Sequence, residues 1–519
     1  MRKFAWCGSH PMMLAGIGIA VLVSFQAGCA GPGPRLFPPA PQQIEHLADQ
    51  VLLHWYDSTG DGRPDYYERL DPQGRVVALG YGAQPGQRVA DEVILASIPA
   101  TERRDLVIIL DSVPASMVRE AWEQGQYRFF PRPTAVIAPF PVMTDPCLVD
   151  FFHLTPGVAI ESDYYDYERG RETDAYDVYL KAGVAIWHER VDYALDHLAH
   201  ASAYLDQLSW FDHELRQIQD GFLASSNPMY IGYCVGTSAL GALRGREGHA
   251  EGISRINRFC HEMMYLTRGR VRITLLSDHG HNLVTSRRIP IADLLRKAGW
   301  NVTNRINGPR DIVLPEFAMA TCSAIYTRMP EAVAQDVMRI EGMELAAYRD
   351  SESSIIVLSP DGRARISRAA EGYRYEALEG DPLQLNPVLA VLNEAGKVNP
   401  DGYVRDDVLM QATIDHVYPD AVDRLWRGLN EQFQHKPDVL ISVADGVHTG
   451  SAFQSRMITL RAAHGNLRPL STFGFAVTTA GELPAVLRIR DLAPALESLG
   501  VNVLKKPEPP SVSPVGSEL

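Results

Sequence analysis

The chain has 519 residues, 46% of them hydrophobic, so it is long enough for one large α/β domain with insertions or for two to three ordinary domains. Its formal net charge of -14 argues against a nucleic-acid partner, because such a partner selects a basic face. An acidic balance of this kind mainly supports solubility and predicts no particular partner.

The N-terminus carries the pattern of an export signal over residues 1–29. Arg2 and Lys3 give a positive start, and an uncharged apolar run follows at residues 12–25. This run of about 14 residues is too short to cross a hydrocarbon core of ~30 Å comfortably, but it suits the apolar region of a signal peptide. We therefore expect an exported protein.

The end of this segment resembles a bacterial lipobox, in which the cysteine is lipidated and becomes the new N-terminus. Small residues precede Cys29, although Gln26 stands where that motif usually has Leu. The alternative is an ordinary cleaved signal peptide with an incidental cysteine. The Pro-rich residues 30–43 predict a tether. The expected location is therefore a lipid anchor in the bacterial cell envelope, on its periplasmic face, or secretion.

Six cysteines are present, and four of them remain after the signal segment and Cys29 are set aside. Export permits disulfide bonds. The wide spacing of the four fits no zinc ribbon, and four cysteines allow three pairings that sequence cannot separate. Disulfide bonds and buried free thiols therefore both stay open for these residues, which are Cys147, Cys234, Cys260 and Cys322.

Residues 44–95 are the first folded segment that we expect. Side-chain oxygens occupy positions 1, 3, 5, 9 and 12 of a loop with glycine at position 6, which is the ligand spacing of an EF-hand-type calcium loop. Residues 75–81 predict a strand, so the loop is more similar to the calcium turns of extracellular β-modules. A plain acidic turn is the alternative. The candidate ligands are Asp57, Thr59, Asp61, Asp65 and Glu68.

An α/β pattern extends over residues 96–284, which we take as the first part of the core. Residues 106–110 are a continuous aliphatic run, typical of a parallel strand that is buried on both faces. Further strands are predicted at residues 135–137, 229–235 and 271–276, and helices at residues 170–222 and 251–266.

The second half of the chain predicts an insertion and then a return to the core. Short strands alternate with helices over residues 285–435, which indicates an α+β cap. Residues 438–443 again have the pattern of a core strand, so we expect residues 436–504 to complete the core. The Pro- and Ser-rich residues 505–519 predict a disordered tail.

Acidic and imidazole side chains directly follow predicted strands. Asp111 follows the first run, the pair Asp278 and His279 follows a later one, and His464 lies near the end of the core. In open α/β sheets, sites lie at the C-terminal ends of strands. Carboxylate oxygen and imidazole nitrogen both bind Zn²⁺ at ~2.0–2.2 Å. Thr144 lies in a Pro-flanked loop, and metal coordination would activate its hydroxyl as a nucleophile.

Four segments in this order resemble the alkaline phosphatase superfamily, in particular its type I phosphodiesterase/nucleotide pyrophosphatase branch. They are the strand that ends at Asp111, the Phe-Pro-x-x-Thr loop that ends at Thr144, the Ser-Asp-His-Gly run at residues 277–280, and the His-Gly pair that begins at His464. The resemblance implies an α/β fold, namely a three-layer α/β/α sandwich with an inserted α+β cap.

The same resemblance implies a role for each residue of the site. Thr144 would be the nucleophile. Asp111, Asp278 and His279 would hold one metal ion beside it. His464 would belong to a second metal ion about 4 Å away. Zinc is the ion that the resemblance favours.

The second metal position departs from the Asp-x-x-Gly-His-x-x-Gly stretch of that family. In the expected place this chain keeps both glycines, Gly241 and Gly245, but has Ser238 for the aspartate and Ala242 for the histidine. Alanine cannot coordinate a metal ion, and a serine hydroxyl is a poor neutral ligand. If this alignment holds, only His464 remains, and one protein ligand is too few for stable occupancy.

Three interpretations follow from this departure. The protein is a hydrolase with one metal ion and a nearby cation, for which Arg244 and Arg246 are candidates. Alternatively, His249, His281 or His448 rescues the second metal site, although His281 also fits a supporting or surface role. In the third interpretation the protein is a pseudoenzyme, because loss of the second metal ion is expected to cost orders of magnitude in rate.

The leading function hypothesis is extracytoplasmic, metal-dependent hydrolysis of a phosphoric ester, either a phosphodiester or a phosphoanhydride, through a phosphothreonine at Thr144. The expected cofactor is one or two divalent ions, zinc first, with calcium as a separate expectation for the N-terminal segment. The expected substrate is a small-molecule, lipid or glycan phosphate ester. The alternative is a catalytically impaired pseudoenzyme that acts as a binding or scaffold protein at the envelope.

Overall fold

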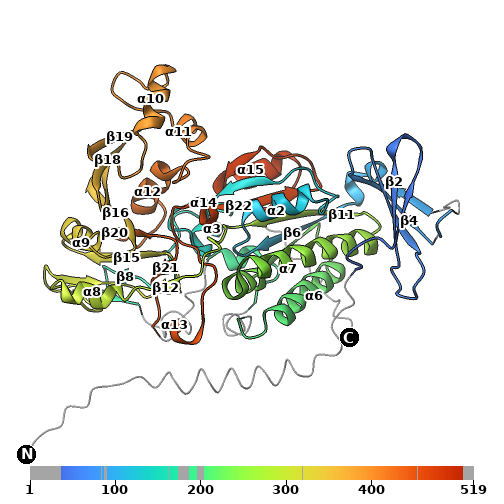
Figure 1. Cartoon of the computed structure of the whole chain (residues 1–519), viewed down its shortest axis with the longest axis horizontal. Coiled ribbons are helices and arrows are strands. Elements are labelled where there is room, and N and C mark those ends of the chain that lie inside the picture. The colour runs from blue at the N-terminus through green and yellow to red at the C-terminus, as the bar shows by residue number, and fades with distance from the viewer. Residues whose placement is uncertain are drawn as a thin grey trace, which may run out of the picture.

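A computed structural model describes most of the chain, and Figure 1 shows a central core between the inserted sheet at one end and the N-terminal sheet at the other. The expected signal peptide with Cys29, the first half of the tether and nearly all of the expected tail lie outside the described residues. The described residues are 37–82, 84–86, 91–161, 163–173, 186–195, 204–317, 319–452 and 454–505.

The core contains a six-stranded sheet. Its strands are β6 (Arg104–Leu110), β7 (Thr134–Ile137), β10 (Met229–Cys234), β11 (Val271–Ser277), β22 (Phe473–Thr478) and β23 (Val486–Arg488). They lie in the order β10-β6-β11-β22-β7-β23. The first three are parallel, while β22 runs antiparallel to both of its neighbours. The aliphatic run at residues 106–110 is therefore a central strand, as predicted.

Helices cover both faces of this sheet. One face packs against α2 (Ala115–Glu123), α6 (Gln207–Ala224) and α7 (Gly236–Leu266). The other face packs against α3 (Thr144–Phe151) and α15 (Ile489–Ser498). The short α14 (Pro469–Thr472) directly precedes β22. This arrangement is the three-layer α/β/α sandwich that the sequence predicted.

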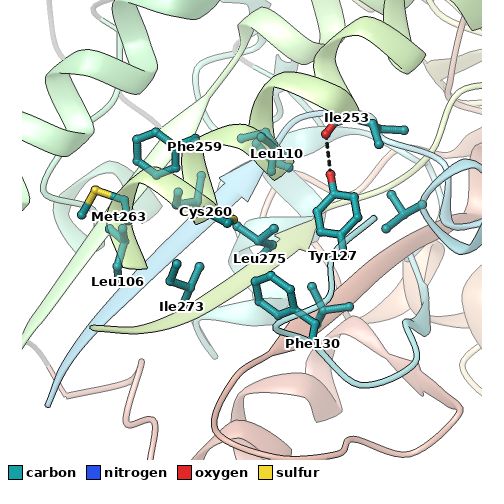
Figure 2. Close-up of a cluster of buried hydrophobic side chains, with 14 of the residues drawn as sticks. Leu106, Leu110, Tyr127, Phe130, Ile253, Phe259, Cys260, Met263, Ile273 and Leu275 are labelled. Atoms are coloured by element: carbon teal, nitrogen blue, oxygen red, sulfur yellow. Dashed lines mark hydrogen bonds between the residues drawn. The ribbon is translucent and has the colours of Figure 1, made fainter. Parts of the chain in front are cut away.

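Successive side chains of a strand point to opposite faces of the sheet, so each face has an apolar core of its own. These two cores hold the three layers together. Leu106 and Ile108 of β6 lie in one core, whereas Val107 and Ile109 lie in the other. Figure 2 shows part of the first core, in which the Tyr127 hydroxyl donates to the carbonyl of Ile253 at 2.7 Å. The buried phenol therefore packs its ring in the core and still has a hydrogen-bond acceptor.

The N-terminal module is a separate antiparallel sheet that packs on the C-terminal half of α7. The Glu68 carboxylate bonds His261 of that helix at 2.6 Å, and the Tyr66 ring meets Tyr265 edge-on at 5.0 Å. The strand expected at residues 75–81 is present. The sheet order is β1-β2-β3-β4-β5. Its elements are β1 (Gln43–His46), η1 (Ala48–Gln50), β2 (Leu52–Tyr56), β3 (Tyr66–Leu70), β4 (Val76–Tyr81), β5 (Asp91–Ile94), η2 (Leu95–Ser97) and η3 (Ala100–Glu102).

The inserted region forms an eight-stranded sheet in the order β13-β14-β15-β20-β16-β17-β18-β19. Its strands are β13 (Asn301–Val302), β14 (Asp311–Val313), β15 (Cys322–Thr327), β16 (Met343–Ser351), β17 (Ser354–Ser359), β18 (Gly362–Ala369), β19 (Gly372–Glu379) and β20 (Val439–Val443). We expected residues 438–443 in the core sheet, and this was wrong. β20 lies between β15 and β16, where any fully buried strand has the same aliphatic pattern.

Further short elements surround this sheet and link it to the core. The two-stranded sheet of β12 and β21 connects the residues after β11 with those after β20. The elements are β12 (Arg287–Arg288), α8 (Ile291–Lys297), α9 (Pro330–Val337), α10 (Asn386–Glu394), α11 (Asp406–Ala412), α12 (Ala421–Asn430), β21 (Val447–His448) and α13 (Gln454–Met457).

A buried Arg–Asp network joins α12 to the core. Arg488 Nε bonds Asp420 at 2.7 Å, and the same guanidinium bonds Asp406 at 2.5 Å. Arg427 of α12 bonds Asp150 of α3 through two contacts, at 2.6 and 2.8 Å. Each carboxylate in this junction therefore has a fixed guanidinium partner. The members of the network are Asp150, Asp406, Asp420, Asp423, Arg427, Arg488 and Arg490.

Two further expectations meet the structure at this level. Long helices were expected over residues 170–222, but among the described residues there this is confirmed only for α6. Residues 171–172 are in the hairpin of β8 (Tyr165–Asp166) and β9 (Arg171–Glu172), and residues 186–190 are the 3₁₀ helix η4 (Ile186–Arg190). The four cysteines at issue are buried free thiols. Among the described residues, no helix combines the length and apolar character needed to cross a bilayer.

Candidate metal centre

The candidate site lies where the parallel strands β6 and β11 end at the same edge of the central sheet. Ser277, the last residue of β11, pairs with Leu110, the last residue of β6, so the residues that follow both strands lie side by side. These residues are Asp111 and Asp278, and both are buried. The Ser112 N–H donates to Asp278 Oδ1 at 3.0 Å and ties this carboxylate to the end of β6.

Asp111, Asp278 and His279 present ligand atoms to one small space. One ligand atom from each lies within 4.8 Å of the others, and all three side chains are buried. His279 Nε2 is 3.5 Å from Asp278 Oδ2 and 4.0 Å from Asp111 Oδ1. Among the residues that the structure describes, no other group of three His, Cys, Asp or Glu side chains gathers in this way.

Two of these ligand atoms lack a hydrogen-bond partner among the described residues. Asp278 Oδ2 and His279 Nε2 are both buried without one, whereas His279 Nδ1 lies 3.1 Å from the carbonyl of Gly280. That contact keeps the proton on Nδ1 and leaves the Nε2 lone pair facing the carboxylates. Buried polar atoms in native proteins are nearly always hydrogen-bonded. Two orphan ligand atoms that share one space therefore fit a divalent cation.

The site concentrates negative charge in a buried place. Burial raises the pKa of Asp278 to about 8, and the neighbouring Asp111 carboxylate acts in the same direction. Burial also lowers the pKa of His279, which keeps its imidazole neutral at pH 7. No arginine or lysine among the described residues is a main cause of either pKa shift. A divalent cation would supply the missing positive charge, since it binds carboxylates and neutral imidazole.

Two hydroxyl groups hold the Asp111 carboxylate. Ser112 Oγ donates to Oδ1 at 2.5 Å, and the Tyr233 hydroxyl donates to Oδ2 at 2.7 Å. Tyr233 is a buried residue of β10, the strand next to β6. Partners of this kind orient a carboxylate toward a metal ion. Sequence reasoning missed both residues, although a tyrosine near the end of an apolar strand was an available signal, because a buried phenol needs a partner.

Thr144 is the first residue of α3 and is partly buried. Its side chain lies beside the Tyr233 hydroxyl, which donates to Asp111. One phenol group therefore connects the predicted nucleophile with a predicted metal ligand. The loop before Thr144 also contacts the last predicted site residue, because His464 Nδ1 lies 2.8 Å from the carbonyl of Val142.

His464 belongs to a stack of imidazole rings beside the carboxylates. Its ring centroid is 4.3 Å from that of His279 and 5.4 Å from that of His281, with interplanar angles of 27° and 29°. Desolvation by the surrounding protein lowers the pKa of His464 to about 4, and His279 acts in the same direction. The structure thus brings together all five residues that the resemblance assigned to the site.

The departure at Ser238 and Ala242 lies on the N-terminal part of α7. Ser238 Oγ is 3.3 Å from Ser112 Oγ, and the same side chain hydrogen-bonds to Tyr204. Position 238 therefore lies beside the carboxylate cluster. Ala242 packs in a small apolar cluster instead. Neither position offers a carboxylate or an imidazole.

Two of the histidines proposed as substitutes do lie near the site. His249 Nε2 is 2.9 Å from His281 Nδ1, and both side chains are buried. Burial lowers the pKa of His249 to about 3 and that of His281 well below its usual range, so both imidazoles are neutral at pH 7. A Cβ atom at Gly241 would lie 2.1 Å from His249 Nε2, so only glycine leaves room for this pair.

Two of the other proposed substitutes, His448 and Arg246, have partners away from the site, and a role for Arg244 stays a prediction. Both ring nitrogens of His448 contact serine hydroxyls, at 2.9 and 3.0 Å. Arg246 is exposed and forms an ion pair with Glu120 on the surface. Arg244 is half-buried on α7 and is not one of the main groups that shift the pKa values of the site carboxylate and imidazoles.

The predicted calcium loop folds as an acidic turn. The Asp57 carboxylate accepts two backbone N–H groups of the turn, and Asp65 accepts the N–H and the hydroxyl of Ser58, each at 2.7 Å. Glu68 is buried in β3 and bonds His261 at 2.6 Å, so it is wrong as a calcium ligand. A calcium role for the other four residues stays a prediction.

Comparison with known proteins gives structural matches alone. No protein family model matches the sequence, and no curated protein does. Murine ectonucleotide pyrophosphatase/phosphodiesterase 5 matches with a TM-score of 0.42 at 11% sequence identity, over 78% of this chain and 96% of that chain. An inactive variant of the murine protein in complex with AMP matches at 0.41 and 11%, and the human protein at 0.41 and 13%, with the same coverage.

Proposed function

We propose that this chain is a metal-dependent hydrolase of phosphoric esters in which Thr144 is the nucleophile. The observation that carries the proposal is a pair of buried ligand atoms on Asp278 and His279, which have no hydrogen-bond partner in the described part of the chain and share one space with a carboxylate oxygen of Asp111. Three protein ligands leave a coordination position open, as catalytic zinc sites require. Tyr233 supports the choice of nucleophile, because its hydroxyl lies beside Thr144 and donates to Asp111.

The residues have separate tasks in the proposed reaction. A divalent cation held by Asp111, Asp278 and His279 would lower the pKa of the Thr144 hydroxyl and offset charge on the phosphoryl group. Thr144 Oγ forms a bond to phosphorus while the ester P–O bond breaks and the alcohol leaves with a proton. Water then cleaves the phosphothreonine and restores the hydroxyl. Tyr233 orients Thr144 relative to the carboxylate during the attack.

The test uses purified protein loaded with Zn²⁺ or Mn²⁺. We expect turnover of bis(4-nitrophenyl) phosphate or 4-nitrophenyl phosphate, and its loss in Thr144→Ala. Thr144→Ser is the matched control, because it keeps a hydroxyl and should keep part of the activity. The metal content of all three proteins should be equal. No turnover of any diester, monoester or phosphoanhydride, or full activity in Thr144→Ala, would contradict the proposal.

A binding protein without turnover is the second candidate. Ser238 and Ala242 favour it, because they stand where a two-metal hydrolase needs ligands. In that case the protein would bind a cation at Asp278 and its neighbours but turn over no ester in the panel above. A phosphate monoester or diester would still bind, and Thr144→Ala would leave its affinity unchanged. Isothermal titration with a non-hydrolysable phosphonate separates the two candidates.

We also propose that the protein acts outside the cytoplasm, anchored through a lipid on Cys29. The support is the apolar segment and the small residues before this cysteine. The anchor would place the site near soluble, lipid or glycan phosphate esters of the envelope. Cys29→Ala should move the protein from the membrane fraction to the soluble fraction of bacterial cells. An unchanged distribution would contradict a lipid anchor.

A further inference from the structure

The N-terminal part of α7 borders the candidate site but supplies no second set of metal ligands. The Ser238 hydroxyl is engaged with neutral hydroxyls, at 3.3 Å from Ser112 Oγ and in a hydrogen bond to Tyr204. One turn later, Ala242 is buried in an apolar cluster. A cation next to this helix would therefore meet no carboxylate and no imidazole from either position.

The two histidines near this place bond each other. His249 Nε2 and His281 Nδ1 are 2.9 Å apart, which is the length of an N–H···N hydrogen bond. Two nitrogen ligands around a tetrahedral cation would lie about 3.3–3.4 Å apart, given bond lengths of about 2.0–2.1 Å. In this contact one ring donates its N–H to the lone pair of the other, so these two nitrogens cannot bind one cation together. Of the outer nitrogens, His249 Nδ1 is buried without a hydrogen-bond partner among the described residues.

The fold is built around this histidine pair. A Cβ atom at Gly241 would lie 2.1 Å from His249 Nε2 and 2.6 Å from His281 Nδ1, so any larger residue would push the rings apart. Both rings are almost completely buried, with 1% of each residue exposed. The contact is thus enclosed by packing and is no chance approach of two surface side chains.

The charge balance of the site also matches one cation. Asp111 and Asp278 carry two negative charges when ionised, which one divalent ion offsets. A second divalent ion would face neutral imidazoles, of which His464 is the single remaining member of the expected ligand set. No further carboxylate from the described residues joins the cluster. Burial of an uncompensated charge is strongly unfavourable, so the second position would stay without a cation.

Building on the proposed function, we infer that the site binds one divalent cation, at Asp111, Asp278 and His279, and that the hydrogen-bonded pair of His249 and His281 stands in place of a second cation. The pair fills space and offers neutral N–H and nitrogen groups where a two-metal hydrolase presents positive charge. The protein is then a one-cation member of a two-cation architecture, which differs from the rescue of the second site by histidines.

The first experiment counts bound metal. The full-length protein is stripped with a chelator, reloaded with excess Zn²⁺ or Co²⁺, desalted and analysed by elemental mass spectrometry. We expect one equivalent per chain in the wild type and none in Asp278→Ala. His249→Ala and His281→Ala should each keep one equivalent. Two equivalents in the wild type, falling to one in His249→Ala, would overturn the inference and show that the histidines hold a second ion.

The second experiment restores the missing ligands. Ser238→Asp combined with Ala242→His should raise the count from one to two equivalents, and the Co²⁺ absorption spectrum should gain a second set of bands. The matched control, Ser238→Asn with Ala242→Gln, has similar size without the carboxylate and imidazole and should stay at one. A count of one in the restored variant, with a wild-type circular dichroism spectrum and melting curve, would contradict the inferred place of the second cation.

The metal counts test the one-cation inference, and the turnover measurements test the hydrolase proposal. One equivalent of metal without turnover of any ester would leave the one-cation inference intact and remove the hydrolase proposal. Turnover by a protein that holds two equivalents would keep the hydrolase proposal and remove the inference. No bound metal after reloading would remove both.

Discussion

The buried carboxylates of this molecule are balanced in two different ways. In the Arg–Asp network that joins α12 to the core, Asp420 meets Arg488 through contacts of 2.7 and 2.8 Å. At the candidate site, Asp111 and Asp278 bond hydroxyl and backbone N–H groups, and one oxygen of Asp278 has no partner among the residues that the structure describes. The first arrangement carries its countercharge on fixed side chains. The second needs a countercharge from outside the protein, which is how a structural ion network differs from a cation site.

The pKa of Asp423 follows the same division, although burial still raises the pKa of its neighbour Asp420 to about 6. Burial alone would raise the pKa of Asp423, but Arg490 and Arg488 overcome burial and lower it to about 2. At Asp278, burial and Asp111 together raise the pKa to about 8. Similar burial therefore has opposite outcomes, because guanidinium groups are present in one place and absent from the other. Perturbed carboxylates without a cationic side chain are the better guide to a site.

The largest effect is expected from a substitution at the candidate site. Asp278→Asn keeps the size of the side chain and an acceptor for the Ser112 N–H, but removes a charged metal ligand. We expect turnover to fall by about 10³-fold or more and the cation to be lost. The metal-free variant should be at least as stable toward urea as the metal-free wild type, because it lacks a buried carboxyl group whose ionisation burial and Asp111 oppose. Lower stability of the metal-free variant would break the comparison.

In the Arg–Asp network we expect the opposite response, namely a loss of stability without a loss of metal. Arg488→Met leaves Asp420 buried without its guanidinium, so we expect the free energy of unfolding to fall by about 3–5 kcal/mol. The metal count should not change. Arg405→Met is the matched control, because the Arg405–Asp407 pair is exposed and its loss should change stability by less than about 1 kcal/mol. Equal effects of the two variants in urea unfolding would show that the network is not structural.

Glu214 of α6 sharpens the comparison, because backbone dipoles alone compensate it. It is buried and accepts the N–H groups of Val235 and Gly236 at 2.9 and 2.8 Å, at the start of α7. Burial nevertheless raises its pKa to about 8. A carboxyl group with a raised pKa stabilises the fold fully below its unfolded pKa of about 4.3, and this contribution is lost as pH rises toward 8.

We therefore expect a pH-dependent loss of stability that Glu214→Gln reduces. The loss for this one group is at most about 5 kcal/mol between pH 4.3 and 8. Urea unfolding of the metal-free protein at pH 5, 6.5 and 8 should give a steeper decline for the wild type than for the variant. Parallel curves would mean that the two backbone N–H groups fully compensate the charge, and Glu214 would then belong with the Arg–Asp network.

The sequence predicted those residues of the site that directly follow a strand. A continuous aliphatic run identifies β6, and the residue after a buried parallel strand must lie at the sheet edge, so Asp111 and Asp278 could be placed together before any coordinates. Tyr233 could not, because its role depends on β10 lying next to β6, and strand order is a long-range property. The local sequence around a residue does not predict which side chain it contacts on a neighbouring strand.

The errors have the same physical origin. β20 was expected in the core because its aliphatic pattern reports burial on both faces, and this pattern does not say which sheet buries it. Glu68 was expected to bind calcium because it has the right spacing from Asp57. Spacing in a loop takes no account of His261, which comes from a distant helix and binds the glutamate at 2.6 Å. Local patterns thus predicted elements and strand ends but not the contacts between distant segments.

The smallest expected effect concerns the surface cation that was considered as a substitute for the second metal ion. Arg246 pairs with Glu120, and their side chains are 59% and 50% exposed, so water and salt screen the pair. Arg246→Ala should change the free energy of unfolding by no more than about 0.5 kcal/mol and leave kcat/KM unchanged. If kcat/KM instead fell tenfold, with the loss reduced at high salt, a long-range positive charge would contribute to the site. The comparison would then need a third kind of countercharge, namely a distant surface cation, beside the fixed guanidinium groups and the bound metal ion.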